Sequence, residues 1–229
     1  MRTLVLFDID GTLVRGGPAK DAFRQAMLDA FRMTGDIQVH DFAGKTDPQI
    51  ARELLTAAGL TDAEVDRGLP VLWRRYVEEL ERLLGERPMQ LIPGALELLD
   101  ALQDGGGVAL GLVTGNIADG ARLKLGSVGL GERFPVGSFG SDHERREHLP
   151  AIAIERAARR FGVAFERRRV RIVGDTPRDV ACGLHEGVRT VGVATGRYDL
   201  ASLLGAGAHA AFTDLRPTPE LLESLLADE

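Results

Sequence analysis

Cysteine, tryptophan and long apolar runs are scarce in this sequence. Its one thiol, Cys182, cannot form an internal disulfide, so the fold must be stable without one. This fits the reducing cytoplasm, and we interpret Cys182 as a buried structural thiol. The N-terminal apolar run, Leu4 to Phe7, is too short for the core of a signal peptide and far too short for a membrane span. We therefore expect a cytoplasmic protein with no membrane partner, and we predict that this run is the first strand.

Positive charge is also in short supply, with 28 lysines and arginines against 34 acidic residues and a formal net charge of −6. Nucleic acid is therefore not an expected partner, and any bound phosphate must meet local positive charge. The 229 residues contain no internal repeat, and 44% of them are hydrophobic and 27% charged. This composition predicts a compact globular enzyme. It leaves open whether the protein is a monomer or a dimer.

The order of the apolar segments predicts an α/β fold. Runs of strand length, rich in Val, Leu or Ile, alternate with stretches of helical pattern. The predicted strands are 4–7, 108–113, 170–173 and 190–193, and two of the predicted helices are 95–102 and 152–161. This alternation predicts a doubly wound parallel sheet built from residues 1–14 and 89–229. In such a sheet, ligands bind at the carboxyl ends of the strands.

Residues 15–88 break the alternation, because they contain helical patterns and no convincing strand. Apolar residues recur there at helical spacing, namely Phe23, Met27, Ala30 and Phe31 in one segment and Leu72, Tyr76, Leu80 and Leu83 in another. We predict an inserted helical domain that forms a cap beside the active site. The same apolar faces could instead pack a peripheral bundle without a role in catalysis.

Two carboxylates follow the first predicted strand, in the segment Phe7-Asp8-Ile9-Asp10-Gly11-Thr12. Asp8 ends the strand, and Asp10 lies in the turn by which the chain leaves the sheet. Hard oxygen ligands of this kind suit Mg²⁺, which can neutralise the repulsion between a carboxylate nucleophile and a phosphoryl group. Taken alone, the pair could equally cap a turn or a helix.

Two more polar segments follow predicted strands at the same edge of the sheet. Thr114-Gly115-Asn116 comes after strand 108–113 and offers a hydroxyl and backbone N–H groups to phosphate oxygens, although these residues also begin ordinary helices. Gly174-Asp175-Thr176-Pro177-Arg178-Asp179 follows strand 170–173. In that segment Thr176, Pro177 and Asp179 are typical of a helix start. Asp175 precedes the cap, where it could complete a metal site.

These three segments, in this order and spacing, resemble the motifs of the haloacid dehalogenase superfamily. The first motif is Asp8-Ile9-Asp10-Gly11-Thr12, the second is Thr114-Gly115-Asn116 and the fourth runs from Gly174 to Asp179. Together with the insertion after the first strand, the resemblance extends over nearly the whole chain. It favours phosphoglycolate-phosphatase-like members, which have a Rossmann-like core and a helical C1-type cap.

The resemblance implies a Mg²⁺-dependent phosphatase that acts on a small phosphorylated metabolite. Asp8 would attack phosphorus to give an aspartyl-phosphate, while Asp10 would protonate the leaving oxygen and later activate water. The resemblance also implies two sets of ligands: for the phosphoryl group Thr114, Gly115 and Asn116, and for Mg²⁺ the Asp8 carboxylate, the Asp10 carbonyl and Asp175, with Asp179 in support of the metal site.

The third motif is where this sequence departs from the family pattern. A lysine usually begins the helix before the fourth motif, but the only lysines here are Lys20, Lys45 and Lys124. We predict that Arg146 takes the place of that lysine, because a guanidinium can hold both phosphoryl and carboxylate oxygens. Arg145 is the competing candidate, and the surrounding charged run could also be a solvated segment.

The segment Gly44-Lys45-Thr46-Asp47 in the insertion resembles one that approaches the substrate in capped phosphatases, so Lys45 and Thr46 are candidate substrate-binding residues. It is not a nucleotide P-loop, because residue 39 is Val where that motif requires Gly and no strand precedes it. A turn followed by a helix cap is the alternative interpretation. The five histidines lack metal-ligand spacing, and we expect Trp73 to pack between helices.

Two other functions remain open. A sugar phosphomutase of the same superfamily would use the same aspartyl-phosphate but return the group to a bound sugar. A member without turnover would bind phosphate or a partner, which the missing lysine makes conceivable.

Overall fold

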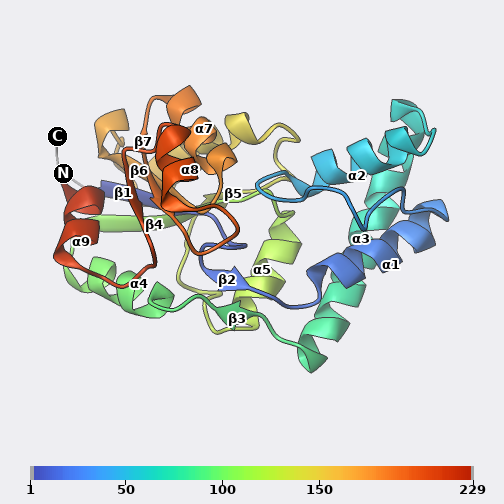
Figure 1. Ribbon diagram of the computed structural model, residues 1–229, viewed down its shortest axis with the longest axis horizontal. Coiled ribbons are helices and arrows are strands. Elements are labelled where there is room, and N and C mark those ends of the chain that lie inside the picture. Colours follow the sequence, from blue (N-terminus) through green and yellow to red (C-terminus); the bar gives the residue numbers. More distant parts are fainter. Residues whose placement is uncertain (1–2, 228–229) are drawn as a thin grey trace.

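The computed structural model describes residues 3–227, and its centre is a parallel sheet in the order β5-β4-β1-β6-β7-β8 (Figure 1). β1 lies in the middle, paired with β4 on one side and with β6 on the other. The six strands are β1 (Thr3–Phe7), β4 (Val108–Val113), β5 (Gly137–Ser138), β6 (Val170–Gly174), β7 (Arg189–Val193) and β8 (Ala210–Phe212). The predicted doubly wound α/β class is confirmed, and each predicted strand is present.

The central strand is buried on both sides. Leu4 and Leu6 belong to one apolar core and Val5 and Phe7 to another, as the two-residue period of a strand requires. Helices cover both faces: on one side α4 (Ala95–Asp104), α5 (Ala118–Gly126) and α9 (Pro219–Leu226), and on the other α6 (Leu149–Phe161), α7 (Pro177–Glu186) and α8 (Leu200–Gly205). This two-sided burial explains why the strands were recognisable as continuous apolar runs.

Four short strands were not predicted. β5 and β8 contain two and three residues, too few side chains to show a period. β2 (Val14–Arg15) and β3 (Gln90–Leu91) form a separate antiparallel ribbon, in which Val14 pairs with Leu91. Residues 15–88, in which no strand was expected, therefore begin with the last residue of β2. This ribbon lies where the helical insertion leaves the core and returns to it.

The insertion contains α1 (Ala19–Phe31), α2 (Asp47–Ala57) and α3 (Asp62–Glu86). α1 and α3 lie side by side, and the ring of Phe23 contacts those of Tyr76 and Trp73 at centroid distances of 5.5 and 6.2 Å (Figure 1). Trp73 is thus a packing residue. α3 begins with a capping box between Thr61 and Glu64, and it also packs against α5 of the core.

Two further sequence features have structural answers. Cys182 on α7 is buried, and burial raises the pKa of its thiol to about 12, so the group stays protonated and packs as an apolar side chain. Across residues 3–227, we find no helix with both the length and the apolar character needed to cross a membrane. Two short 3₁₀ helices, Arg146–His148 and Arg167–Arg169, complete the fold.

Candidate active site

Three neighbouring strands deliver the predicted site residues to one edge of the sheet. Phe7, the last residue of β1, pairs with Leu112 of β4 and with Val173 of β6. Asp8, Thr114 and Asp175 therefore leave adjacent parallel strands at nearly the same level. Residues distant in the sequence meet there because the strands run in one direction.

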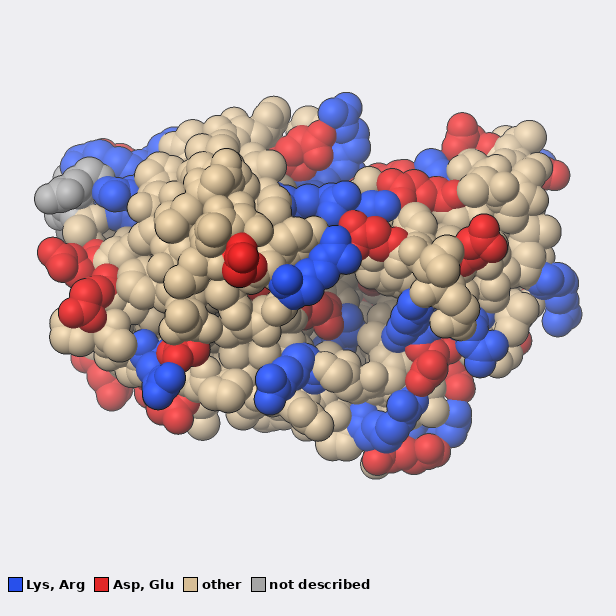
Figure 2. All heavy atoms as spheres, in the orientation of Figure 1, with Lys and Arg blue, Asp and Glu red and all other residues tan. Residues whose placement is uncertain are grey.

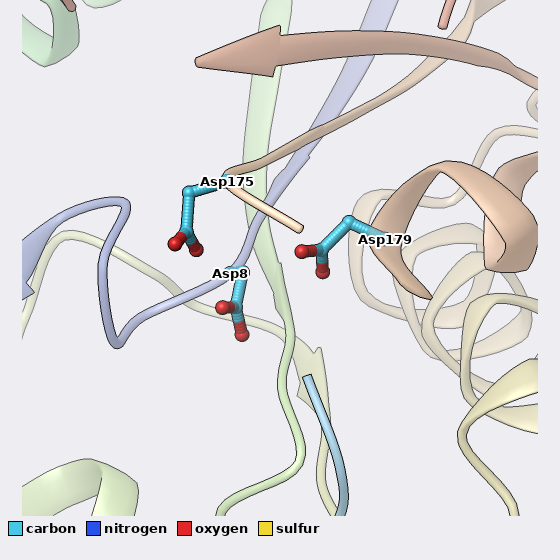
Figure 3. Close-up of side chains that lie close together, drawn as sticks. All are labelled: Asp8, Asp175 and Asp179. Carbon is cyan, nitrogen blue, oxygen red and sulfur yellow. The ribbon is translucent and has the colours of Figure 1, made fainter. Parts of the chain in front are cut away.

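Three buried carboxylates form an acidic cluster, which Figure 3 shows from within the site. One oxygen from each of Asp8, Asp175 and Asp179 lies within 4.8 Å of the others. Burial raises the pKa of Asp8 and of Asp175, and the negative charge of Asp179 raises both further. Because these carboxylates are costly to ionise, a cation bound among them would stabilise their charged forms.

Gly11 gives the Asp175 carboxylate its space. A Cβ atom at Gly11 would lie 2.3 Å from Asp175 Oδ2, and the positive φ of 85° at Gly11 suits glycine. The hydroxyl of Thr12 donates a hydrogen bond of 3.3 Å to Asp175 Oδ1. The glycine and threonine after the two aspartates thus accommodate the carboxylate that arrives from β6.

Arg146 contacts two carboxylates of the acidic cluster. Its Nη2 atom lies 2.9 Å from Asp8 Oδ1 and also pairs with Asp179, while Nη1 donates to the Gly44 carbonyl at 3.2 Å. Arg146 is 5% exposed, and the two aspartates raise the pKa of its guanidinium despite burial. Arg145 instead lies on the surface, paired with Glu147. Of the two candidates, the structure places only Arg146 beside Asp8.

Both carboxylate oxygens of Asp179 accept hydrogen bonds from other residues of the protein. Oδ2 accepts hydrogen bonds from the backbone N–H of Thr176 at 3.0 Å and from its hydroxyl at 2.7 Å, and Oδ1 accepts from Arg146. The Thr176 hydroxyl in turn caps α7, as the sequence predicted. Asp179 therefore links the start of α7 to the arginine that contacts Asp8.

A second polar chain begins at Thr114. Its Oγ1 atom accepts hydrogen bonds from the side chain of Asn116 at 2.8 Å and from its backbone N–H at 3.3 Å. Asn116 Nδ2 also donates to Asp10 Oδ2 at 2.7 Å. Asp10 further accepts from Lys124 Nζ through both oxygens, at 2.9 and 2.7 Å. The Asp10 side chain is thus outside the acidic cluster and bound to a lysine.

The segment Gly44 to Asp47 of the insertion is bound directly to the core. The Asp47 N–H donates to the Gly115 carbonyl at 2.7 Å, and the Asp47 carboxylate accepts from the Ile117 N–H at 2.8 Å. Gly115 makes this approach possible, because a Cβ atom there would lie 2.1 Å from the Lys45 carbonyl oxygen. The second motif is therefore also the docking point of the insertion.

The two candidate substrate-binding residues of this segment have different positions. Lys45 lines the cavity described below, but its ammonium is paired with Glu53 and lies 3.4 Å from His40 Nε2. Thr46 is fully buried and is not among the residues that line the cavity. Its hydroxyl accepts from the Gln49 N–H as the N-cap of α2 and donates to the Glu144 carbonyl. Its geometry is that of a helix cap.

A cavity of about 500 Å³ opens between the core and the insertion, and Figure 2 shows the hollow with basic side chains near its rim. Asp8, Asp10, Thr114 and Asp175 line its core side. All three lysines of the chain line it as well, as do Arg146 and Arg197. The 28 lysines and arginines of this acidic protein include only these three lysines, so lysine is concentrated at this one site.

Sequence reasoning missed several of these residues. Lys124 stands inside an ordinary helix, and nothing in its sequence neighbourhood marks it as a partner of Asp10. Lys20 and Arg197 reach the cavity from α1 and from the loop after β7. The one available signal was composition, because a residue type used only three times had a better than usual chance of a specific role.

Comparison with known proteins identifies relatives by sequence and by fold. A phosphoglycolate phosphatase of Rhodobacter capsulatus is 27% identical over 228 residues, which cover 97% of this chain and 98% of the relative. The fold is shared with a hydrolase of Pseudomonas syringae (TM-score 0.73, 22% identity, covering 99% and 100% of the two chains) and with a putative β-phosphoglucomutase of Bacteroides vulgatus (0.69, 19%, covering 98% and 88%). The family model of the haloacid dehalogenase-like hydrolases matches residues 3–185. The chain therefore belongs to the haloacid dehalogenase-like hydrolase family.

Proposed function

We propose that this protein is a Mg²⁺-dependent phosphatase of small phosphate monoesters, with Asp8 as its nucleophile. The observation that carries the proposal is the contact between Asp8 and Arg146 at the lining of the cavity, next to Asp175. A carboxylate that attacks a phosphoryl group must overcome the repulsion of like charges. Asp8 is in contact with the guanidinium of Arg146. Together with the neighbouring carboxylate of Asp175, it could also bind a metal cation.

In this proposal Asp8 is the nucleophile and Asp10 is the general acid and base. In the first half-reaction an Asp8 oxygen bonds to phosphorus, the bond from phosphorus to the leaving oxygen breaks, and Asp10 protonates that oxygen. In the second, water attacks phosphorus, its proton passes to Asp10, and the bond between phosphorus and Asp8 breaks. The products are an alcohol and inorganic phosphate, and both aspartates return to their starting states.

The acidic cluster fits a divalent cation. We assign Mg²⁺ to the carboxylates of Asp8 and Asp175 and to the carbonyl of Asp10, with Asp179 in support because both of its oxygens already accept hydrogen bonds. The raised pKa of the Asp8 and Asp175 carboxyls means that their ionisation costs free energy, and such a cation would offset that cost. When bound, Mg²⁺ would draw negative charge from the phosphoryl oxygens.

The second motif supplies hydrogen bonds for the phosphoryl group. Because Thr114 Oγ1 accepts two hydrogen bonds from Asn116, its own proton is available to a phosphoryl oxygen. Arg146 provides the fixed positive charge on the other side of Asp8. This arrangement supports turnover over mere binding, since the absence of the usual lysine does not leave Asp8 without a cation.

We propose phosphoglycolate, or a similarly small ester with a second anionic group, as the substrate. The Rhodobacter capsulatus relative is a phosphoglycolate phosphatase, and the cavity suits a small ligand. Lys20 donates to the Gln38 carbonyl at 3.3 Å and lies over the ring of Phe42, but it pairs with no carboxylate within residues 3–227. It is therefore our candidate for the second anion, with Lys45 committed to Glu53.

We also propose that the insertion serves as a cap over this site. It supplies Lys20, Lys45 and Asp47 to the cavity lining while the core supplies the reacting groups. Arg178 adds a further tie between them, donating to the Ala43 carbonyl at 2.6 Å. A cap over the cavity would limit the access of bulk water to the aspartyl-phosphate until the leaving group departs.

A screen of phosphate release tests the proposal. Phosphorylated metabolites, including phosphoglycolate, are incubated with the protein and Mg²⁺, and Asp8→Asn serves as the blank. We expect phosphate release that falls to background in Asp8→Asn while its circular dichroism stays native. Hydrolysis that is unchanged in Asp8→Asn would contradict the nucleophile assignment, and turnover that depends on a sugar bisphosphate would indicate a phosphomutase instead.

A further inference from the structure

Lys124 is a buried ammonium at the edge of the active site, contributed by α5 of the core. Only 4% of the residue is exposed. Its Nζ atom donates to Asp10 Oδ1 at 2.9 Å, to Asp10 Oδ2 at 2.7 Å and to Asn116 Oδ1 at 2.6 Å. An ammonium has three protons, so these three contacts use its whole donor capacity on two neighbours.

The Asp10 side chain is held from two directions as a result. Lys124 contacts both of its oxygens, and Asn116 Nδ2 donates to Oδ2 at 2.7 Å. Nevertheless 44% of the Asp10 side chain remains exposed, and the residue lines the cavity. The carboxylate is therefore fixed in orientation and still accessible to a ligand or to water.

The same contacts connect Asp10 to the phosphoryl-binding hydroxyl. Asn116 accepts from Lys124 through Oδ1 and donates through Nδ2 to Thr114 Oγ1 at 2.8 Å and to Asp10. One asparagine, oriented by one lysine, thus sets the spacing between Thr114 and Asp10. All four residues belong to the core, so this spacing does not depend on a side chain of the insertion.

We propose that Lys124 is a positioning residue for Asp10, and this inference rests on the proposed function. In the second half-reaction, water must lie against both phosphorus and an Asp10 oxygen while its proton moves to Asp10. A carboxylate that is free to rotate meets that geometry only part of the time. Lys124 keeps Asp10 in the orientation that faces the cavity, and its three protons are donated to Asp10 and Asn116.

The test separates the two half-reactions. With 4-nitrophenyl phosphate and Mg²⁺, the leaving group departs without help from a proton donor, so formation of the aspartyl-phosphate depends little on Asp10. Rapid mixing measures nitrophenolate release in the first turnover and in the steady state. In Lys124→Met we expect a burst followed by slow turnover, with the ratio of burst rate to steady-state rate raised about 10-fold or more over wild type.

Controls distinguish positioning from a structural role. Asp10→Asn should give the same pattern, and the double variant should be no slower than Asp10→Asn, because both changes disable one function. Arg122→Met changes an exposed basic residue of the same helix and should leave the ratio at the wild-type value. Lys124→Arg should restore part of the steady-state rate.

Partial unfolding of Lys124→Met does not change the ratio, because only folded, active molecules contribute to the burst rate and to the steady-state rate. Lys124→Gln provides a second variant.

The outcomes are distinct. If Asp8→Asn still turns over, the proposed function is wrong. If Asp8→Asn is inactive and Asp10→Asn shows the burst, but Lys124→Met and Lys124→Gln keep the wild-type ratio, then the proposed function stands and the role of Lys124 is wrong. A raised KM with an unchanged ratio would also overturn the role, since it would indicate direct contact with the substrate.

Discussion

Arg146 Nη2 lies 2.9 Å from Asp8 Oδ1, although 138 positions of sequence separate the two residues. The arginine enters the site at the first residue of the 3₁₀ turn before α6, so the rigid start of that helix sets its position. It also contacts Asp179 and the Gly44 carbonyl of the insertion. One side chain thus joins Asp8, the N-terminal cap of α7 and a segment of the insertion that lines the cavity.

Removal of this guanidinium should affect activity far more than removal of its neighbour. We expect Arg146→Ala to lower kcat/KM by about 100-fold or more, the usual effect of losing a fixed charge at a reacting group. Arg145→Ala, which loses only a surface pair with Glu147, should change kcat/KM by less than about twofold. Steady-state kinetics on matched preparations measure both.

Arg146→Ala also leaves two buried carboxylates without their cation, which costs about 3–5 kcal/mol in buried pairs. Circular dichroism must therefore establish the folded fraction first. The reverse ranking of the two variants would assign the third-motif role to Arg145.

Magnesium should stabilise the folded protein through the acidic cluster. At about one hundred times its Kd, a ligand adds about 2.7 kcal/mol, which raises the Tm of a chain of this size by roughly 5–10 °C. We expect Asp175→Asn to abolish that increase in thermal unfolding followed by circular dichroism. Asp119→Asn, an exposed acidic residue of α5, is the matched control and should keep the full increase. An increase that survives in Asp175→Asn would place the cation elsewhere.

Asp47 should make stability depend on pH. Burial raises the pKa of this carboxyl from 3.8 to about 6, with Lys124 acting in the opposite direction. The folded protein then binds the proton more tightly than the unfolded chain does. The contribution is complete below about pH 4 and is lost as the pH rises through about 6, at most about 3 kcal/mol.

Asp47→Asn removes this titration but retains a side-chain oxygen for the Ile117 N–H. The free energy of unfolding, from urea titrations at pH 4 to 7, should fall less steeply with pH in the variant than in the wild type. Identical slopes would show that Asp47 does not titrate in this range.

Lys20 should discriminate between substrates by their second charge. Its ammonium has no carboxylate partner in the described chain, and it lines the cavity. We expect Lys20→Met to raise KM for phosphoglycolate about 10-fold or more, because a hydrogen bond between charged groups contributes about 1.5–3 kcal/mol. KM for ethyl phosphate, which lacks the carboxylate, should hardly change. Arg24→Met, on the same helix but outside the cavity lining, controls for net charge. Equal losses on both esters would exclude a role in carboxylate recognition.

Gly115 should tolerate no side chain. A Cβ atom there would lie 2.1 Å from the Lys45 carbonyl, so Gly115→Ala must push the insertion away from the second motif. A displacement of about 1 Å can cost about 100-fold in rate. Gly126→Ala, at the end of α5 where the added atom meets nothing within 4 Å, should keep full activity. Both variants are compared by kcat/KM, and a fully active Gly115→Ala would show that this close approach is not needed.

Much of this architecture was predictable from short stretches of sequence. β1, β4, β6 and β7 are apolar runs because they are buried on both faces, and the polar residues after them mark the ligand edge. β5 and β8 were not predicted, because these short strands are defined by their pairing with β4 and β7 in the folded protein and not by a local sequence pattern. The same holds for the β2–β3 ribbon, whose two strands are 75 or more positions apart.

By itself, the sequence determined that Asp8, Thr114 and Asp175 meet, because parallel strands bring their carboxyl ends to one edge wherever the intervening chain goes. It favoured Arg146 for the third motif but kept Arg145 as a competitor, since adjacent residues of a turn differ mainly in the direction of their side chains. Tertiary structure placed Arg146 beside Asp8 and Arg145 on the surface, and it brought Lys124 to Asp10, 114 positions away. The presence of the long strands follows from local patterns, but contacts between side chains depend on how helices pack against the sheet.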